Sequence, residues 1–147
     1  MSEKLFAGSA AGADAAPGLE LFAEIEETNR QSGAYTVEAD DFAGIYRFVM
    51  RIQDRMDKQA HLVSFCFHSR LNTPPEPGTV EEGFRIVQRC LRRGDIACMN
   101  GQTILAILMG ADEEGCRVAA DRIVSTYEAH CSGSAFTLKY EMREIRS

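Results

Sequence analysis

An asparagine–glycine pair between two apolar segments constrains the fold more than any other feature of the sequence. Asn100-Gly101 follows the short apolar segment 95–99 and precedes the segment 102–109, QTILAILM. An Asn-Gly pair favours the type I′ turn that joins adjacent antiparallel strands, so the pair predicts a β-hairpin. Because the second strand is apolar on both of its faces, it is expected in the middle of a sheet that is covered on both sides.

The segments around this hairpin alternate between strand and helix periodicity. The predicted elements are, in order, a strand at 61–68, a helix at 79–94, the hairpin strands at 95–99 and 102–109, a helix at 112–132 and a strand at 134–143. Thr79 and Glu82 are expected to form a capping box for the first helix, and Asp112 is expected to begin the second. This order predicts an α+β fold, a ferredoxin-like βαββαβ sheet whose first and third strands lie in the middle.

A further amphipathic helix is expected at 41–56, before the first of these strands. Asp40 or Asp41 can cap this helix. Its apolar residues recur in steps of three and four along one stripe: Phe42, Ile45, Val49, Ile52 and Met56. Because the central strands need cover on their second face, the helix is predicted to pack against the sheet. Pairing of the same stripe with a second copy of the chain is the alternative.

Charge and residue size divide the chain into three parts. Residues 1–18 are mostly small residues that bury little area, and they are expected to form a disordered arm. Residues 19–40 are expected to be an acidic leader that can form a short helix. Together with Asp41 the leader carries a formal charge of −6, which equals the net charge of the whole chain. The expected domain at 41–147 is therefore close to neutral.

Composition and charge exclude several classes of function. The acidic balance argues against non-specific nucleic-acid binding, which requires basic charge to displace counterions. No segment has the ~20 consecutive apolar residues of a membrane-spanning helix. Residues 1–18 lack the apolar core of a secretory signal. We therefore expect a cytoplasmic protein with no nucleic-acid partner, no membrane partner and, because its five cysteines are widely spaced, no metal site.

Arginines recur along the solvent side of two predicted helices. Arg47, Arg51 and Arg55 follow one another at four-residue intervals on the helix at 41–56, and a second row lies on the helix at 79–94. Such rows are often only solvated surface. Alternatively they pair with an anionic partner, which is either the acidic leader or an acidic segment of another protein.

The segment Leu91–Ile123, LRRGDIACMNGQTILAILMGADEEGCRVAADRI, has a more specific pattern. It resembles the GGDEF domain family, the diguanylate cyclases, around their signature hairpin. Arg92-Arg93-Gly94-Asp95 aligns with the Arg-x-x-Asp motif of that family. Gly101-Gln102-Thr103-Ile104-Leu105 aligns without gaps with the Gly-Gly-Asp-Glu-Phe turn. The resemblance implies the fold of a bacterial-type signalling domain.

The departures from this family concern the residues that its chemistry requires. Family members hold two Mg²⁺ ions with carboxylates from the end of the first strand and from the signature turn. In this chain the first strand ends Phe67-His68-Ser69-Arg70, and the signature acids are replaced by Thr103 and Ile104. A hydroxyl group and an alkyl group are poor ligands for Mg²⁺. We therefore expect no catalytic residues, no enzymatic activity and no cofactor.

Arg92 and Asp95 are the residues that can retain a role. The resemblance implies that they match the motif with which the family binds its cyclic dinucleotide product. Alternatively, Asp95 only caps a turn and Arg92 only complements the carbonyl end of its helix. The expected function is a catalytically inactive GGDEF-like regulatory module whose partner is another protein or a second copy of the chain. The alternative is a sensor that binds a cyclic dinucleotide or another phosphate-bearing small ligand near Arg92 and Asp95.

Overall fold

The computed structural model describes residues 32–146, which form five strands and three helices. The elements are β2 (Tyr35–Val37), α2 (Ala39–Gln53), β3 (Ala60–Ser69), α3 (Pro77–Cys90), β4 (Ile96–Asn100), β5 (Thr103–Met109), α4 (Glu113–His130) and β6 (Phe136–Glu144). The predicted arm at 1–18 and most of the predicted leader lie outside the described residues. None of the helices within the described part is both long and apolar enough to cross a membrane.

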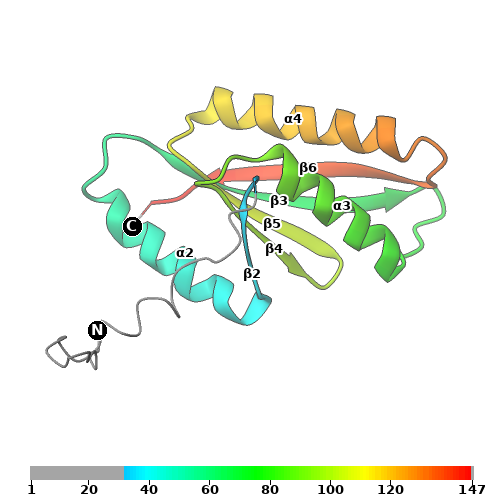
Figure 1. Cartoon of the computed structure of the whole chain (residues 1–147), viewed down its shortest axis with the longest axis horizontal. Helices are drawn as coiled ribbons and strands as arrows, with labels where there is room; N and C mark the ends of the chain where they lie inside the picture. The colour runs from blue at the N-terminus through cyan, green and yellow to red at the C-terminus, as the bar shows by residue number, and fades with distance from the viewer. Residues whose placement is uncertain (1–31, 147) are drawn as a thin grey trace, which may run out of the picture. The chain divides into compact units, whose positions relative to one another are not determined.

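The strands form one mixed sheet in the order β2-β4-β5-β3-β6, as Figure 1 shows. The pair β2–β4 is parallel, and the other three pairs are antiparallel. The prediction that the strand at 61–68 and the second hairpin strand occupy the middle is confirmed, because β3 and β5 are neighbours at the centre. The chain from β3 to β6 has the βαββαβ order, and the arrangement is compatible with a ferredoxin-like fold.

Helices α3 and α4 cover one face of the sheet (Figure 1). The register places Phe65 of β3 opposite Ile104 of β5 and Tyr140 of β6, so these three side chains share that face. Phe65 and Ile104 are completely enclosed, and Ile86 of α3 and Ile123 of α4 pack in the same cluster. This layer is the larger of the two hydrophobic cores in the described part of the chain.

Helix α2 covers the opposite face, as its apolar stripe predicts. Phe42 and Val49 are buried against Cys98 of β4, Ile107 of β5 and Ile145, the residue after β6. The sheet is therefore covered on both sides at its centre, which explains why β5 is apolar on both faces. Met56 was expected in the stripe, but α2 ends at Gln53 and Met56 is about half exposed.

Strand β2 is the main difference from the arrangement that the sequence predicts. Residues 35–37 were expected in the acidic leader, and the structure pairs them in parallel with Ile96–Cys98 at the edge of the sheet. Gln88 of α3 fixes the residues just before this strand, because its side chain donates to the backbone oxygens of Ser32 and Ala34, each at 3.0 Å. Three residues show no periodicity of their own, so only the free edge of β4 explains why they form a strand.

The hairpin is confirmed, although its turn lies one residue later than predicted. Asn100 pairs with Thr103, which leaves Gly101 and Gln102 as the two central residues. Gly101 has a φ of 65° and Gln102 does not have a positive φ. Glycine with positive φ at the first central position is the pattern of a type II′ turn, not of the type I′ turn that Asn100-Gly101 predicts.

Two predicted helix starts are wrong, because both helices begin earlier than predicted. The expected Thr79–Glu82 capping box is absent: α3 begins at Pro77, where proline needs no hydrogen-bond acceptor and its fixed φ suits the first helical turn. Helix α2 begins at Ala39, so the expected caps Asp40 and Asp41 lie within its first turn. There they still stabilise the positive end of the helix dipole. The predicted cap Asp112 is confirmed, because its side chain accepts from Gly115 N at 2.8 Å.

Two glycines within helices are expected to respond oppositely to alanine. A Cβ at Gly44 of α2 would meet no atom within 4 Å, whereas a Cβ at Gly83 of α3 would lie 2.7 Å from the ring of Phe67. Gly44→Ala should raise the free energy of unfolding by about 1 kcal/mol through helix propensity. Gly83→Ala should lower it by about 1–3 kcal/mol through overpacking. Urea unfolding of both variants provides the measurement, and a shift of the same sign in both would contradict the packing described for α2 and α3.

Candidate functional site

The structure brings the predicted site residues Arg92 and Asp95 together in the turn between α3 and β4. The Nε atom of Arg92 lies 3.7 Å from Oδ2 of Asp95. The two side chains differ greatly in exposure, because 67% of the arginine side chain but only 3% of the aspartate side chain is accessible. The pair therefore presents a guanidinium group to solvent and keeps its carboxylate inside.

Each carboxylate oxygen of Asp95 accepts a backbone N–H group. Its Oδ2 accepts from Arg92 N and its Oδ1 accepts from Met109 N, each at 3.0 Å. Arg92 adds a third link to the same strand end, since its Nη2 donates to Met109 O at 3.0 Å. These bonds tie the turn after α3 to the end of β5. Asp95 thus acts as a turn cap, the alternative that the sequence left open, and any contact with a ligand falls to Arg92.

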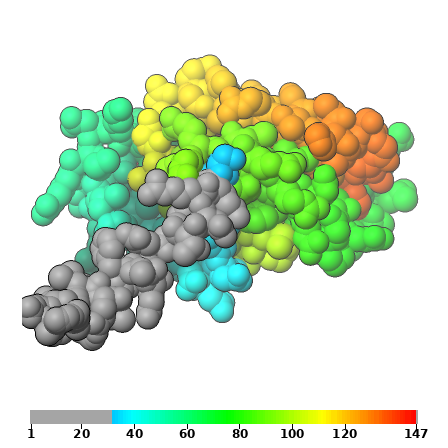
Figure 2. Space-filling model, viewed as in Figure 1, coloured from blue at the N-terminus to red at the C-terminus, as the bar shows by residue number. Residues whose placement is uncertain are grey.

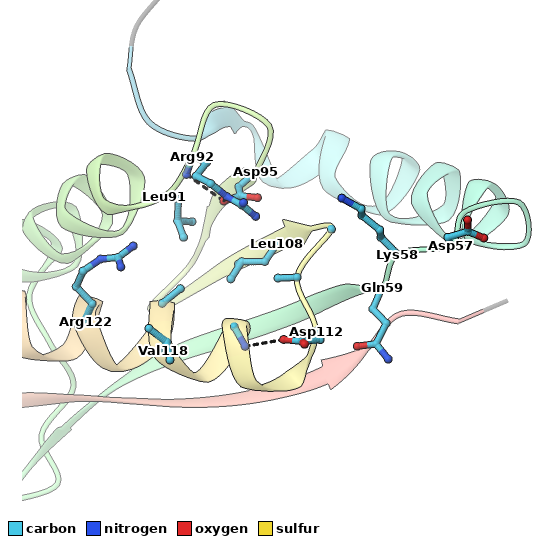
Figure 3. A pocket seen from close by; sticks show the side chains of 14 residues that line it. Asp57, Lys58, Gln59, Leu91, Arg92, Asp95, Leu108, Asp112, Val118 and Arg122 are labelled. Carbon is cyan, nitrogen blue, oxygen red and sulfur yellow. Dashed lines mark hydrogen bonds and ion pairs between the residues drawn. The ribbon is translucent and has the colours of Figure 1, made fainter.

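A cavity of about 610 Å³ lies beside this turn. It is enclosed by the loop between α2 and β3, the turn between α3 and β4, and the first half of α4, three segments that adjoin at the surface in Figure 2. Its apolar lining consists mainly of Leu91, Leu108 and Val118 (Figure 3). The volume is within the range of pockets that hold small organic ligands.

Three basic side chains line this cavity, and each comes from a different segment. Lys58 belongs to the α2–β3 loop, Arg92 to the α3–β4 turn and Arg122 to α4 (Figure 3). Arg122 is held in place by a bond from its Nη2 to Cys90 O at 3.2 Å. Both arginines use one nitrogen on a backbone carbonyl and keep further N–H groups for another acceptor. The three cations therefore lie around one cavity, which makes it favourable for an anionic ligand.

Three acids line the same cavity, and two of them have their own contacts. Asp95 accepts two backbone N–H groups, and Asp112 caps α4. Asp57 is exposed in the α2–β3 loop. Cys116 is buried on α4 near this turn, and burial together with the charge of Asp95 raises the pKa of its thiol to about 11. At neutral pH this thiol is therefore protonated and unreactive.

The aligned signature residues 101–105 are at the opposite end of the hairpin strands from this cavity and present no acid. Gly101 and Gln102 form the exposed turn, and Thr103 begins β5. Ile104 is completely buried in the core beneath α3, so a side chain at this position faces the protein interior. Within residues 32–146 no group of three or more His, Cys, Asp or Glu side chains is placed to hold a metal ion.

Lys58 and Arg122 are the site residues that the sequence did not indicate. Lys58 follows a predicted helix, and Arg122 lies in the middle of another, so neither has a distinctive neighbour in the sequence. The exposed position of Arg122 on a helix next to a buried Ile123 was predictable, but its convergence with Arg92 depends on how α3 packs against α4. No local signal could have identified this arrangement.

Comparisons with known proteins leave the geometry as the basis for a functional argument. No protein-family model matches the sequence, and no curated protein matches it.

Proposed function

We propose that this chain is a non-catalytic regulatory module that binds a phosphate-bearing small molecule in the cavity beside Arg92. The observation that carries the proposal is the convergence of Lys58, Arg92 and Arg122 on one cavity of about 610 Å³. Guanidinium groups bind phosphate oxygens through paired, charge-assisted hydrogen bonds, and lysine adds a compact positive charge. The apolar lining can accept the flat face of a base or another ring.

The resemblance to GGDEF domains directs the choice of ligand within this class. Arg92 and Asp95 align with the motif through which that family binds its product, so a cyclic dinucleotide is the first ligand to test. We propose that the chain is a degenerate member of this family. The absence of an acid at Thr103 and Ile104 supports the inactive half of the proposal, because these side chains have no carboxylate oxygens to offer the metal ions of a cyclase.

Isothermal titration calorimetry with cyclic di-GMP, GTP and inorganic phosphate tests the binding site. We expect one of these to bind the intact chain, and Lys58→Ala and Arg122→Ala each to weaken it about 10-fold or more, since a hydrogen bond to a charged group contributes roughly 1.5–3 kcal/mol. Arg70→Ala is the matched control, because Arg70 is exposed in the loop after β3 and does not line the cavity. Its affinity should equal that of the unmodified chain.

Three results would overturn the proposal. Affinity that is unchanged in both Lys58→Ala and Arg122→Ala would place the ligand elsewhere, and no binding of any of the three compounds would remove the site. Formation of a cyclic dinucleotide from GTP in the presence of Mg²⁺, detected by chromatography, would show that the chain is an enzyme.

A further inference from the structure

The outer face of α2 is not needed for the fold. The helix packs Phe42 and Val49 against the sheet, and its opposite side is exposed to solvent over the described residues. Gly44 lies on that outer side, where an added side chain would meet no atom within 4 Å. Packing therefore does not require particular residue types on this face, so the residues found there can indicate a binding function of the helix.

Three arginines form a row along this outer face. Arg47 and Arg51 belong to α2, and Arg55 follows in the turn that prolongs it, where its N–H donates to Ile52 O at 3.0 Å. Four residues of helix rise about 6 Å, so the row presents a positive charge at about that interval. All three are exposed, and within residues 32–146 none of them forms an ion pair. Asp54 is the acidic neighbour of the row and reduces its net charge.

An exposed aromatic ring lies beside the row. Phe48 is 62% exposed, because its position on α2 faces away from the apolar side that packs on the sheet. Phenylalanine and arginine are both enriched at the centres of protein interfaces, where an apolar contact excludes water from neighbouring charged pairs. The combination of an unburied ring with unpaired guanidinium groups is therefore typical of a binding surface for a protein segment.

The second arginine row, on α3, is different. Arg85 there forms an ion pair with Glu82 at 2.9 Å, and this contact lowers the pKa of the Glu82 carboxyl. Arg92, which was predicted in the same helix, lies in the turn after α3 and bonds to Asp95 and Met109 at the cavity. The α3 row is thus partly neutralised by its own domain, whereas the α2 row is not.

We infer that the surface formed by Arg47, Phe48, Arg51 and Arg55, the α2 basic face, binds an acidic segment of a partner protein. Carboxylates about 6 Å apart match the arginine interval, as on a helix with glutamates four residues apart. Each arginine can hold a carboxylate through two parallel hydrogen bonds. An apolar side chain between the glutamates covers Phe48. This surface is separate from the cavity of the proposed function, and its test requires no small ligand.

Other anionic partners fit this surface less well. An interfacial helix inserts an apolar stripe into a membrane, but the stripe of α2 is already buried against the sheet, which leaves only Phe48 to insert. A nucleic acid is disfavoured because residues 41–147 are together close to neutral, whereas phosphate backbones require an excess of basic charge. A protein segment with a few carboxylates needs only the local row.

The experiment is a titration of the ¹⁵N-labelled full chain with a synthetic helical peptide that has glutamate at every fourth position and leucine next to each glutamate. We expect amide shifts confined to residues 44–56. Arg51→Glu should weaken the binding about 10-fold, because it replaces an attraction by a repulsion. Phe48→Ala should weaken it several-fold. The matched control Arg70→Glu makes the same charge change in the loop after β3 and should leave the affinity unchanged.

The α2 basic face is rejected if the shifts fall outside residues 44–56, or if the peptide with glutamine in place of glutamate binds equally well. Binding of vesicles of phosphatidylcholine and phosphatidylserine that is lost in Phe48→Ala, without binding of the acidic peptide, would assign the face to a membrane instead. Circular-dichroism melts show whether each variant is folded. If Arg51→Glu is not folded, Arg51→Gln, which removes the charge without reversing it, is used in its place.

Discussion

Replacing Asp95 by alanine is expected to lower the free energy of unfolding by about 2–5 kcal/mol. The variant leaves the backbone N–H groups of Arg92 and Met109 without their acceptor at a position that is almost completely buried. Each unsatisfied buried donor costs about 1–3 kcal/mol. Because the carboxylate also connects the turn after α3 to the end of β5, its loss should loosen both segments. Urea unfolding followed by circular dichroism measures the change.

The matched control for this experiment is Asp112→Ala. Asp112 also accepts a backbone N–H, but it is exposed at the start of α4, so its replacement should cost only about 1 kcal/mol. A loss in Asp95→Ala no larger than in Asp112→Ala would mean that the buried carboxylate is not a structural acceptor. Because Asp95→Ala is expected to be unstable, a loss of ligand binding in that variant could reflect unfolding, whereas Lys58→Ala and Arg122→Ala remove no buried acceptor.

Phe65→Ala is expected to lower the free energy of unfolding by about 3–5 kcal/mol. Phe65 is 1% exposed on the central strand β3, opposite Ile104 on one side and Tyr140 on the other. Its ring centroid lies 6.1 Å from that of Tyr140. Removing the ring leaves a cavity between the sheet and the helices α3 and α4, and the surrounding side chains can fill it only in part. A loss of this size is a large fraction of the roughly 5–15 kcal/mol by which a domain is stable.

Leu71→Ala is the control for loss of apolar volume without burial. Leu71 is 83% exposed in the loop after β3, and its replacement should change the free energy of unfolding by less than about 0.5 kcal/mol. Urea denaturation of both variants gives the two values. Equal effects in Phe65→Ala and Leu71→Ala would contradict the position of β3 at the centre of the sheet.

The helix starts show where local rules of sequence stop being sufficient. Thr79 and Glu82 have the spacing of a capping box, yet α3 already begins at Pro77. Two start signals were present within one turn, and the proline provides the earlier one at no cost in hydrogen bonds. At α2 the extended residue before the helix is Glu38, because β2 ends immediately before it. The choice between adjacent signals thus depends on the neighbouring element.

The candidate site was predictable only in part. The spacing of Arg92 and Asp95 before the hairpin indicated the turn between α3 and β4 as a candidate site, and the structure places both residues at the cavity. The sequence could not show that Asp95 is a structural acceptor and that Arg92 faces the ligand site, because the role of Asp95 depends on a bond from Met109 N at the end of β5. It also gave no indication of Lys58 and Arg122, which lie more than 25 residues away on either side.

The Asn100-Gly101 pair and the segment after it, which is apolar on both faces, predicted the hairpin at the centre of the sheet from the sequence alone. Apolar periodicity indicated the central strands, and the need to cover their second face indicated the position of the helix at 41–56. Tertiary structure decided the rest. Residues 35–37 became a strand only because β4 offers a free edge. The basic cavity exists only because the fold brings together side chains from three segments that are distant in the sequence, and local periodicity does not encode such a contact.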